Sequence, residues 1–231
     1  MISDILSGDF DVISFLLRIP IVLIALSVHE CAHGYAAYKM GDPTAKAFGR
    51  LTLNPLKHLD VFGTLSMFLF GFGWAKPVPV DARRFKNQKT GMALTALAGP
   101  LSNVLLSFLG LVLWAILYVI AVKIPALFTQ SQFGVTLYDT TVTFLYMFHI
   151  MNLSLAVFNL LPIPPLDGSR LAFVFLPDKL YFDVMKYEQI IQMVLLIALF
   201  TGLLDTPLNF VISGISDGMF NIINGIVRFI V

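Results

Sequence analysis

The chain has little of several residue classes. Only one of its 231 residues is a cysteine, 13% are charged, and the formal net charge is +1. A single cysteine excludes an intrachain disulfide. The near-neutral charge gives no basic field of the kind that nucleic-acid-binding proteins carry, and neither a P-loop nor a spaced Cys/His finger motif is present. We therefore expect no nucleic acid partner.

Apolar residues are abundant instead. The chain is 58% hydrophobic, and its mean hydropathy is +0.85, far above the values of soluble proteins. This composition predicts an integral membrane protein with the lipid bilayer as its surroundings. Residues 1–11 are acidic and no small-residue cleavage site follows the first apolar run, so we expect no signal peptide.

The apolar runs predict an all-α polytopic membrane protein. A helix needs about 20 apolar residues to cross the hydrocarbon core, and on this measure the chain has about five to six transmembrane helices. The uncharged run ending at residue 166 stops at prolines that cannot continue a helix. The last run, 208–231, either spans the membrane or lies at its surface. We expect spans over residues 12–38, 91–122 and 140–166 and within 187–231.

Residues 41–90 have a different character within what we expect to be a single membrane domain, 1–231. They are rich in Gly and Pro, include β-like runs such as 50–53, and contain an apolar run, 61–72, that is too short to span. We expect a re-entrant or interfacial region with β-hairpin strands. An exposed strand edge there could receive an unwound substrate by β-augmentation.

The positions of Lys and Arg predict the orientation of the spans. Nine of the fifteen lie in residues 39–89, and three more, Arg170, Lys179 and Lys186, lie in the loop after residue 165. Because positively charged loops stay in the cytoplasm, we expect both segments on the cytoplasmic face. The acidic N-terminus and residues 123–139 are then expected on the other face.

An H-E-x-x-H motif, His29 to His33, lies in the second half of the first expected span. Two histidines four residues apart share one helical face and can bind one metal ion. Glu30 can then act as general base on a water at that ion, whereas Cys31 points away from this face. The motif predicts one zinc ion per chain, held at membrane depth.

A catalytic zinc usually takes three protein ligands, so a third is expected elsewhere. Asp167 is one candidate, because it follows the proline-rich break directly after an uncharged run. The less favoured alternative is an ordinary loop aspartate or a helix N-cap. His58 and His149 are rival ligands.

Five sequence motifs, in this order, resemble those of the site-2 proteases, which are intramembrane zinc metalloproteases. The resemblance is to the compact prokaryotic type without a PDZ or CBS domain; we expect no span before the first motif. The matching motifs are HECAH (29–33), NPLKH (54–58), GWAKPVPV (73–80), GPLSN (99–103) and NLLPIPPLDG (159–168).

The resemblance implies that His29, His33 and Asp167 bind zinc and that Glu30 is the catalytic acid/base. It also implies regulated intramembrane proteolysis, in which the chain cleaves a peptide bond within or beside the transmembrane helix of a membrane-protein substrate. The active site is expected near the cytoplasmic face of a prokaryotic cell membrane.

Asn159 is expected near the zinc by the same resemblance, where its amide would hold substrate or the developing oxyanion. An interhelical hydrogen bond is the alternative. His149, Asn152 and Asn159 share roughly one helical face, which either lines the cavity or joins helices. His58 is given a structural or substrate-gating role. Gly99 and Asn103 are expected to form a helix-packing contact. The expected substrate-contacting residues are His58, Asn54, Lys76, Pro77, His149 and Asn152.

Two other functions fit parts of the sequence. A zinc-binding transporter or channel would need further ionisable residues across the spans, but between residues 91 and 166 only Lys123, Asp139 and His149 can ionise. A catalytically silent membrane scaffold is disfavoured because Glu30, the base whose loss would silence the site, is intact.

Overall fold

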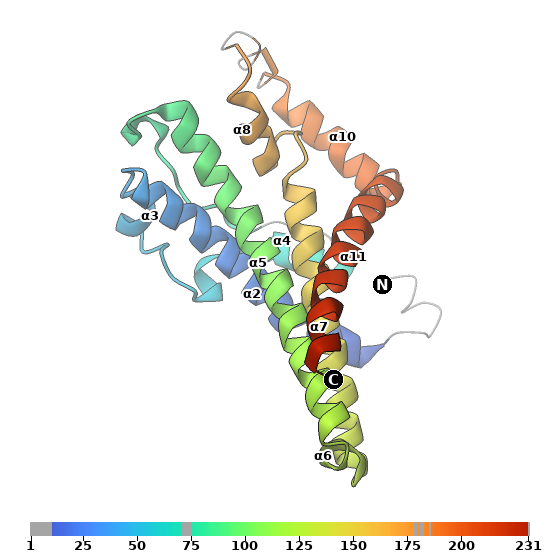
Figure 1. Ribbon diagram of the computed structural model, residues 1–231. Helices are drawn as coiled ribbons and strands as arrows, with labels where there is room; N and C mark the ends of the chain where they lie inside the picture. Colours follow the sequence, from blue (N-terminus) through green and yellow to red (C-terminus); the bar gives the residue numbers. More distant parts are fainter. Residues whose placement is uncertain (1–10, 71–74, 178–179, 181–182, 185, 231) are drawn as a thin grey trace.

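The structure is a computed structural model and describes residues 11–70, 75–177, 180, 183–184 and 186–230. These residues are mainly helical (Figure 1). Four helices in this part of the chain are long and apolar enough to cross a membrane, fewer than the five to six expected. They are α2 (Val12–Lys39), α5 (Gln88–Lys123), α7 (Gln132–Asn159) and α11 (Asp205–Ile230). A fifth apolar helix, α10 (Glu188–Phe200), is too short.

The ends of the long helices follow from capping residues and prolines. Asp11 accepts hydrogen bonds from the backbone N–H groups of the first turn of α2, and Ser131 does the same for α7. Helix α2 covers the predicted first span, 12–38, and is long and apolar enough to cross a membrane. The predicted span 140–166 is wrong at both ends, because the cap at Ser131 starts α7 earlier and the helix ends at Asn159, before the prolines.

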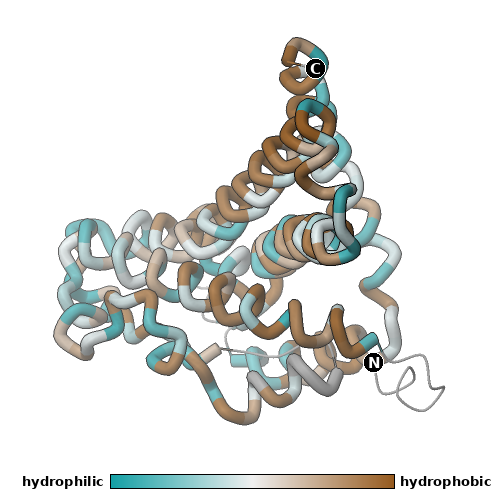
Figure 2. Tube along the Cα trace, turned by 90° about the horizontal axis from the view of Figure 1, so that it is seen from below, coloured by the Kyte–Doolittle hydropathy of each residue, from teal (hydrophilic) through white to brown (hydrophobic). Residues whose placement is uncertain are grey.

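Helix α5 is continuous and lies at the centre of the bundle. It contains Pro100 and continues through it without a break. It packs against α2, α7, α8 (Asp167–Phe173) and α11. The short α6 (Ala126–Thr129) joins α5 to α7 at the end of the bundle opposite α8 (Figure 1). Hydrophobic residues dominate the long helices (Figure 2).

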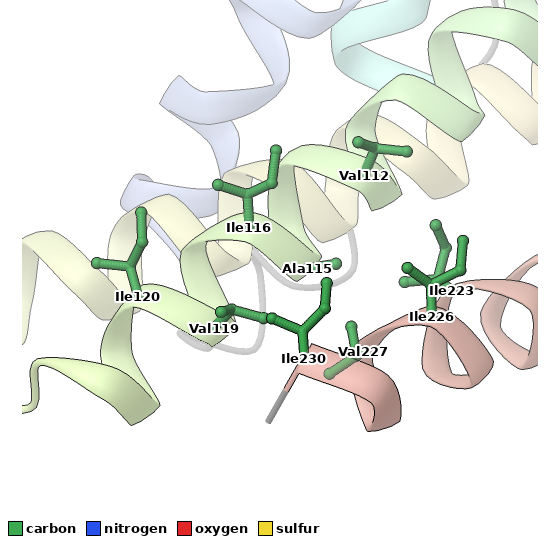
Figure 3. Close-up of a pocket in the computed structure, with 9 residues that line it drawn as sticks. All are labelled: Val112, Ala115, Ile116, Val119, Ile120, Ile223, Ile226, Val227 and Ile230. Carbon is green, nitrogen blue, oxygen red and sulfur yellow. The ribbon is translucent and has the colours of Figure 1, made fainter.

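Helix α11, the run left open as span or surface helix, is a continuous helix long enough to span. It packs against α5 through a small apolar core of Leu111, Ala115 and Ile223. Beside this core, a groove of about 240 Å³ runs between the two helices, lined entirely by Val, Ile and Ala side chains (Figure 3). The groove offers no polar group for chemistry.

The expected β-hairpin in residues 41–90 is wrong for the part of this segment that the structure describes. A single antiparallel bridge, Leu59 to Ala75, is present instead. Asn54 caps a 3-10 turn that begins at a proline, and residues 61–70 of the apolar run form a helix. The segment therefore offers no strand edge for β-augmentation within its described residues, and Gly73 and Trp74 of the third motif lie outside them. Its elements are α3 (Thr44–Ala47), η1 (Pro55–Lys57), α4 (Val61–Phe70) and η2 (Ala82–Arg84).

Hydrogen bonds tie the two halves of this segment together. The Lys76 N–H donates to the His58 carbonyl at 2.8 Å, and Arg50 donates to the Lys76 carbonyl at 2.5 Å. Nearby, the buried Asp42 carboxylate accepts from the Asp81 N–H at 2.7 Å. A side-chain hydrogen bond from Arg83 lowers the pKa of Asp81 to about 2. The loop after residue 75 is thus fixed against the first part of the segment.

Gly168 places the start of α8 against the end of α7. A Cβ at this position would lie 2.5 Å from the Leu161 carbonyl oxygen, which is backbone and cannot yield. We predict that Gly168→Ala destabilises the protein by about 1–3 kcal/mol through overpacking, measured by thermal unfolding. Gly218→Ala is the control, because a Cβ there meets nothing within 4 Å. Equal stability of the two variants would contradict the prediction.

Candidate metal centre

Three side chains from two distant parts of the chain meet at one point. Helix α2 carries His29 and His33, which are 5% and 9% exposed. Asp167 is the first residue of α8. Its Oδ2 lies 3.2 Å from the Nε2 of His29 and 3.2 Å from the Nε2 of His33. The two Nε2 atoms are 3.0 Å apart.

The triangle has the size that a tetrahedral zinc ion requires. At bond lengths of about 2.0–2.2 Å, two tetrahedral ligand atoms lie about 3.3–3.6 Å apart. The observed separations of 3.0–3.2 Å are only slightly shorter. Two imidazoles and one carboxylate leave the fourth position open, as in catalytic sites.

The far sides of both imidazole rings support the same conclusion. The Nδ1 of His29 lies 2.5 Å from Oδ1 of Asn103, and the Nδ1 of His33 lies 2.7 Å from the Thr95 carbonyl oxygen. Both partners are acceptors, so each Nδ1 carries the proton and each Nε2 presents a lone pair. Three acceptor atoms, counting Oδ2 of Asp167, then face one another, and a cation between them removes their repulsion. The residues fit zinc.

Gly99 lets α5 pass close to the histidine pair. A Cβ at this position would lie 2.7 Å from the Nε2 of His29 and would also collide with His33. We predict that Gly99→Ala weakens zinc binding, because the methyl group pushes the ligand rings off their geometry. Metal titration of the purified variant against Gly218→Ala measures this. Wild-type zinc affinity in Gly99→Ala would show that the close approach has no part in the site.

Glu30 is buried beside the metal ligands and is held by the backbone. It is 8% exposed, and its Oε2 accepts a hydrogen bond from the Val78 N–H at 2.9 Å. Residues 77 and 79 are prolines and have no N–H, so Val78 supplies the only backbone donor of residues 77–79. The carboxylate is thereby oriented, while its other oxygen is left to accept a proton.

The remaining predicted residues have varied surroundings. The Asn159 amide donates to the Leu155 carbonyl of its own helix. His58 is fully buried and its Nε2 donates to the Thr52 carbonyl, so it does not join the metal triad. Asn54 caps η1. Among the expected substrate contacts, Lys76 and Pro77 are exposed.

His149 and Asn152 are completely buried between helices. The His149 ring lies between two serine hydroxyls, Ser107 on α5 and Ser216 on α11. Oδ1 of Asn152 accepts from the Asn103 amide. The shared helical face was expected either to line the cavity or to join helices. The hydrogen bonds of His149 and Asn152 join helices.

Two partners of the site were not predicted as such. Asn103 was expected to pack helices, yet it contacts His29; the Thr95 carbonyl holds His33. Asn103 follows Gly99 by one helical turn, so a close approach and a polar side chain share one face. That spacing could have indicated that Asn103 makes a polar contact where the helices approach closely. The Thr95 carbonyl at His33 and the Val78 N–H at Glu30 are backbone groups, so no residue type in the sequence could have predicted these contacts.

The comparison with known families agrees with this geometry. The family model of peptidase family M50 matches residues 18–201, most of the chain, including all three candidate ligands. The chain belongs to peptidase family M50. The resemblance to site-2 proteases is thereby confirmed, and the family together with the apolar helices makes this M50 chain an integral membrane protein.

Two bacterial relatives carry names that mark them as candidate zinc metalloproteases. YwhC of Bacillus subtilis is 44% identical over 150 residues, which are 65% of this M50 chain and 64% of the relative. Rip2 of Mycolicibacterium smegmatis is 29% identical over 159 residues, 67% of this chain and 55% of the relative. The matches thus span less than two thirds of each relative's length. No solved structure gives a significant match.

Proposed function

We propose that this M50 chain is a zinc endopeptidase that hydrolyses peptide bonds in or next to transmembrane segments of membrane proteins. The observation that carries the proposal is the convergence of His29, His33 and Asp167 at 3.0–3.2 Å with their lone pairs facing one another. Two of these ligands lie within α2, a helix long enough to span. The names of the two relatives support the same chemistry.

The residues divide the chemistry among them. A zinc ion held by His29, His33 and Asp167 would supply Lewis acidity, polarising a scissile carbonyl and acidifying a water molecule. Glu30, oriented by the Val78 N–H, takes the proton of the attacking water on its free oxygen. It then delivers that proton to the leaving nitrogen of the substrate.

We propose that Asn159 assists the reaction and does not bind the ion. Its side-chain amide has two N–H groups, and one of them donates to the Leu155 carbonyl. We propose that the other N–H contacts the substrate carbonyl oxygen as negative charge develops there. Asn159 is the last residue of α7 and stands eight positions before Asp167, the first residue of α8 and the third ligand.

The site lies toward one end of its helix. His33 precedes the last residue of α2, Lys39, by six positions, so it lies about 9 Å from the helix end at 1.5 Å per residue. We propose that this end faces the cytoplasm, because nine of the fifteen Lys and Arg residues follow it in residues 39–89. Both relatives are bacterial, in keeping with a prokaryotic cell membrane.

The proposal is tested with purified, zinc-loaded protein and a single-span model substrate in the same proteoliposomes. Mass spectrometry of the products locates the cut. A cut within or directly beside the apolar segment is expected, and a water-soluble unfolded protein serves as the comparison substrate. Cleavage of the soluble protein alone, or no cleavage by the zinc-loaded chain, would overturn the proposal.

A further inference from the structure

A buried chain of hydrogen bonds leads from His29 across three helices. Oδ1 of Asn103 on α5 lies 2.5 Å from Nδ1 of His29 on α2. Nδ2 of Asn103 donates to Oδ1 of Asn152 on α7 at 3.0 Å. Nδ2 of Asn152 in turn donates to the Phe148 carbonyl at 2.8 Å. Both asparagines are 0% exposed, so water does not compete for these bonds.

The chain of bonds has a direction, which its far end sets. The Phe148 carbonyl only accepts, so the Asn152 amide must turn its nitrogen toward it and its oxygen toward Asn103. The Asn103 nitrogen then faces two oxygens, because the Ala25 carbonyl also accepts from it at 3.2 Å. The Asn103 oxygen is left to face His29. An asparagine flip would break these bonds in a dry interior.

We propose that Asn103 and Asn152 are positioning residues that fix the tautomer of His29, Asn103 directly and Asn152 through Asn103. With Nδ1 of His29 protonated against the Asn103 oxygen, Nε2 is kept as a lone pair directed at the ion. The inference rests on the proposed zinc site and adds to it the groups that orient one ligand. Such outer partners commonly govern metal affinity.

An amide suits this position better than the carboxylate that often supports a zinc-bound histidine. Two carboxylates, Glu30 and Asp167, already lie at the site. A third buried negative charge at membrane depth would be costly. The amide offers an acceptor without charge, and its donor end anchors it to the neighbouring helices.

The same helix interface supplies a matched control. Ser107 lies one turn beyond Asn103 on α5, is also 0% exposed, and bonds to His149 of α7 at 2.7 Å. Its partners do not include His29. Removing the Ser107 hydroxyl therefore deletes an α5–α7 hydrogen bond of the same kind without touching the metal ligands.

The test compares zinc affinity, by competition with a chromophoric chelator, and the visible spectrum of the cobalt-loaded full chain. We expect Asn103→Leu to weaken zinc binding by about 10- to 100-fold and to shift the cobalt bands, and Asn152→Leu to do the same to a smaller degree. Asn103→Asp restores the acceptor for His29 but loses the donor to Asn152 and buries a charge, so it should recover only part of the lost affinity. Ser107→Ala should match the wild type.

Unchanged zinc affinity and an unchanged cobalt spectrum in folded Asn103→Leu would overturn the inference, as would an equal loss in Ser107→Ala. If the leucine variant does not fold, Asn103→Ser replaces it with the same expectation, because its short side chain cannot reach both partners. These readouts need no substrate. Failure of the inference about Asn103 and Asn152 is therefore distinct from failure of the proposed peptidase activity. A chain without peptidase activity would still show the expected zinc affinities.

Discussion

Glu30→Gln is expected to lower kcat/KM for a transmembrane substrate by about 10²- to 10⁴-fold, the contribution of a positioned general base. The amide has nearly the shape of the carboxylate and keeps an oxygen that can accept from the Val78 N–H. It cannot, however, take a proton from water at neutral pH. The loss should therefore appear in kcat, with the fold intact.

The measurement is a steady-state assay in proteoliposomes, with zinc content determined on the same samples. One zinc per chain is expected in both wild type and Glu30→Gln, since Glu30 is not a ligand. Cleavage at the wild-type rate in the variant would exclude Glu30 as the base. Loss of zinc in the variant would instead make the carboxylate part of the metal site.

Asp167→Ala is expected to lose zinc and, with it, all cleavage. Asp167 supplies the only carboxylate of the candidate triad and lies 138 residues from His29 in the sequence. Without it, two imidazoles remain, and the ion loses both a ligand and the negative charge that balances it. The zinc dissociation constant should rise by more than the roughly 100-fold that loss of an outer-shell partner costs.

Competition titration with a chelator measures this change. Asp139→Ala is the control, because Asp139 is an exposed aspartate on α7 away from the metal ligands. Its zinc affinity should equal that of the wild type. Retention of tight zinc binding by Asp167→Ala would mean that another residue completes the site, with His58 and His149 as the rivals weighed from the sequence.

The sequence predicted the parts of the site whose signals are local or belong to a motif. His29 and His33 share one helix, so their spacing alone places both imidazoles on one face. The place of Asp167 after the prolines made it one candidate, and the order of several motifs favoured it over His58 and His149. Composition similarly predicted a long first helix, because an apolar run of this length has few other stable structures in a bilayer.

The sequence did not predict features that depend on contacts between distant segments. Short runs rich in Gly and Pro in residues 41–90 suit strands or turns alike, and the structure there consists of short helices and turns within its described residues. The contact of Asn103 with His29 joins residues 74 positions apart. The spacing of Asn103 from Gly99 indicates a close helix contact, but it does not identify His29 as the partner.

The central claim is that two distant segments form one zinc site with two imidazoles and one carboxylate. Zinc X-ray absorption spectroscopy on the purified wild-type protein tests it most directly, because it reports the ligand atoms of the bound ion. We expect only nitrogen and oxygen ligand atoms, at about 2.0–2.2 Å from the ion, with scattering from two imidazoles. A sulfur ligand at about 2.3 Å, which Cys31, the single cysteine, could provide, or a third imidazole would contradict it.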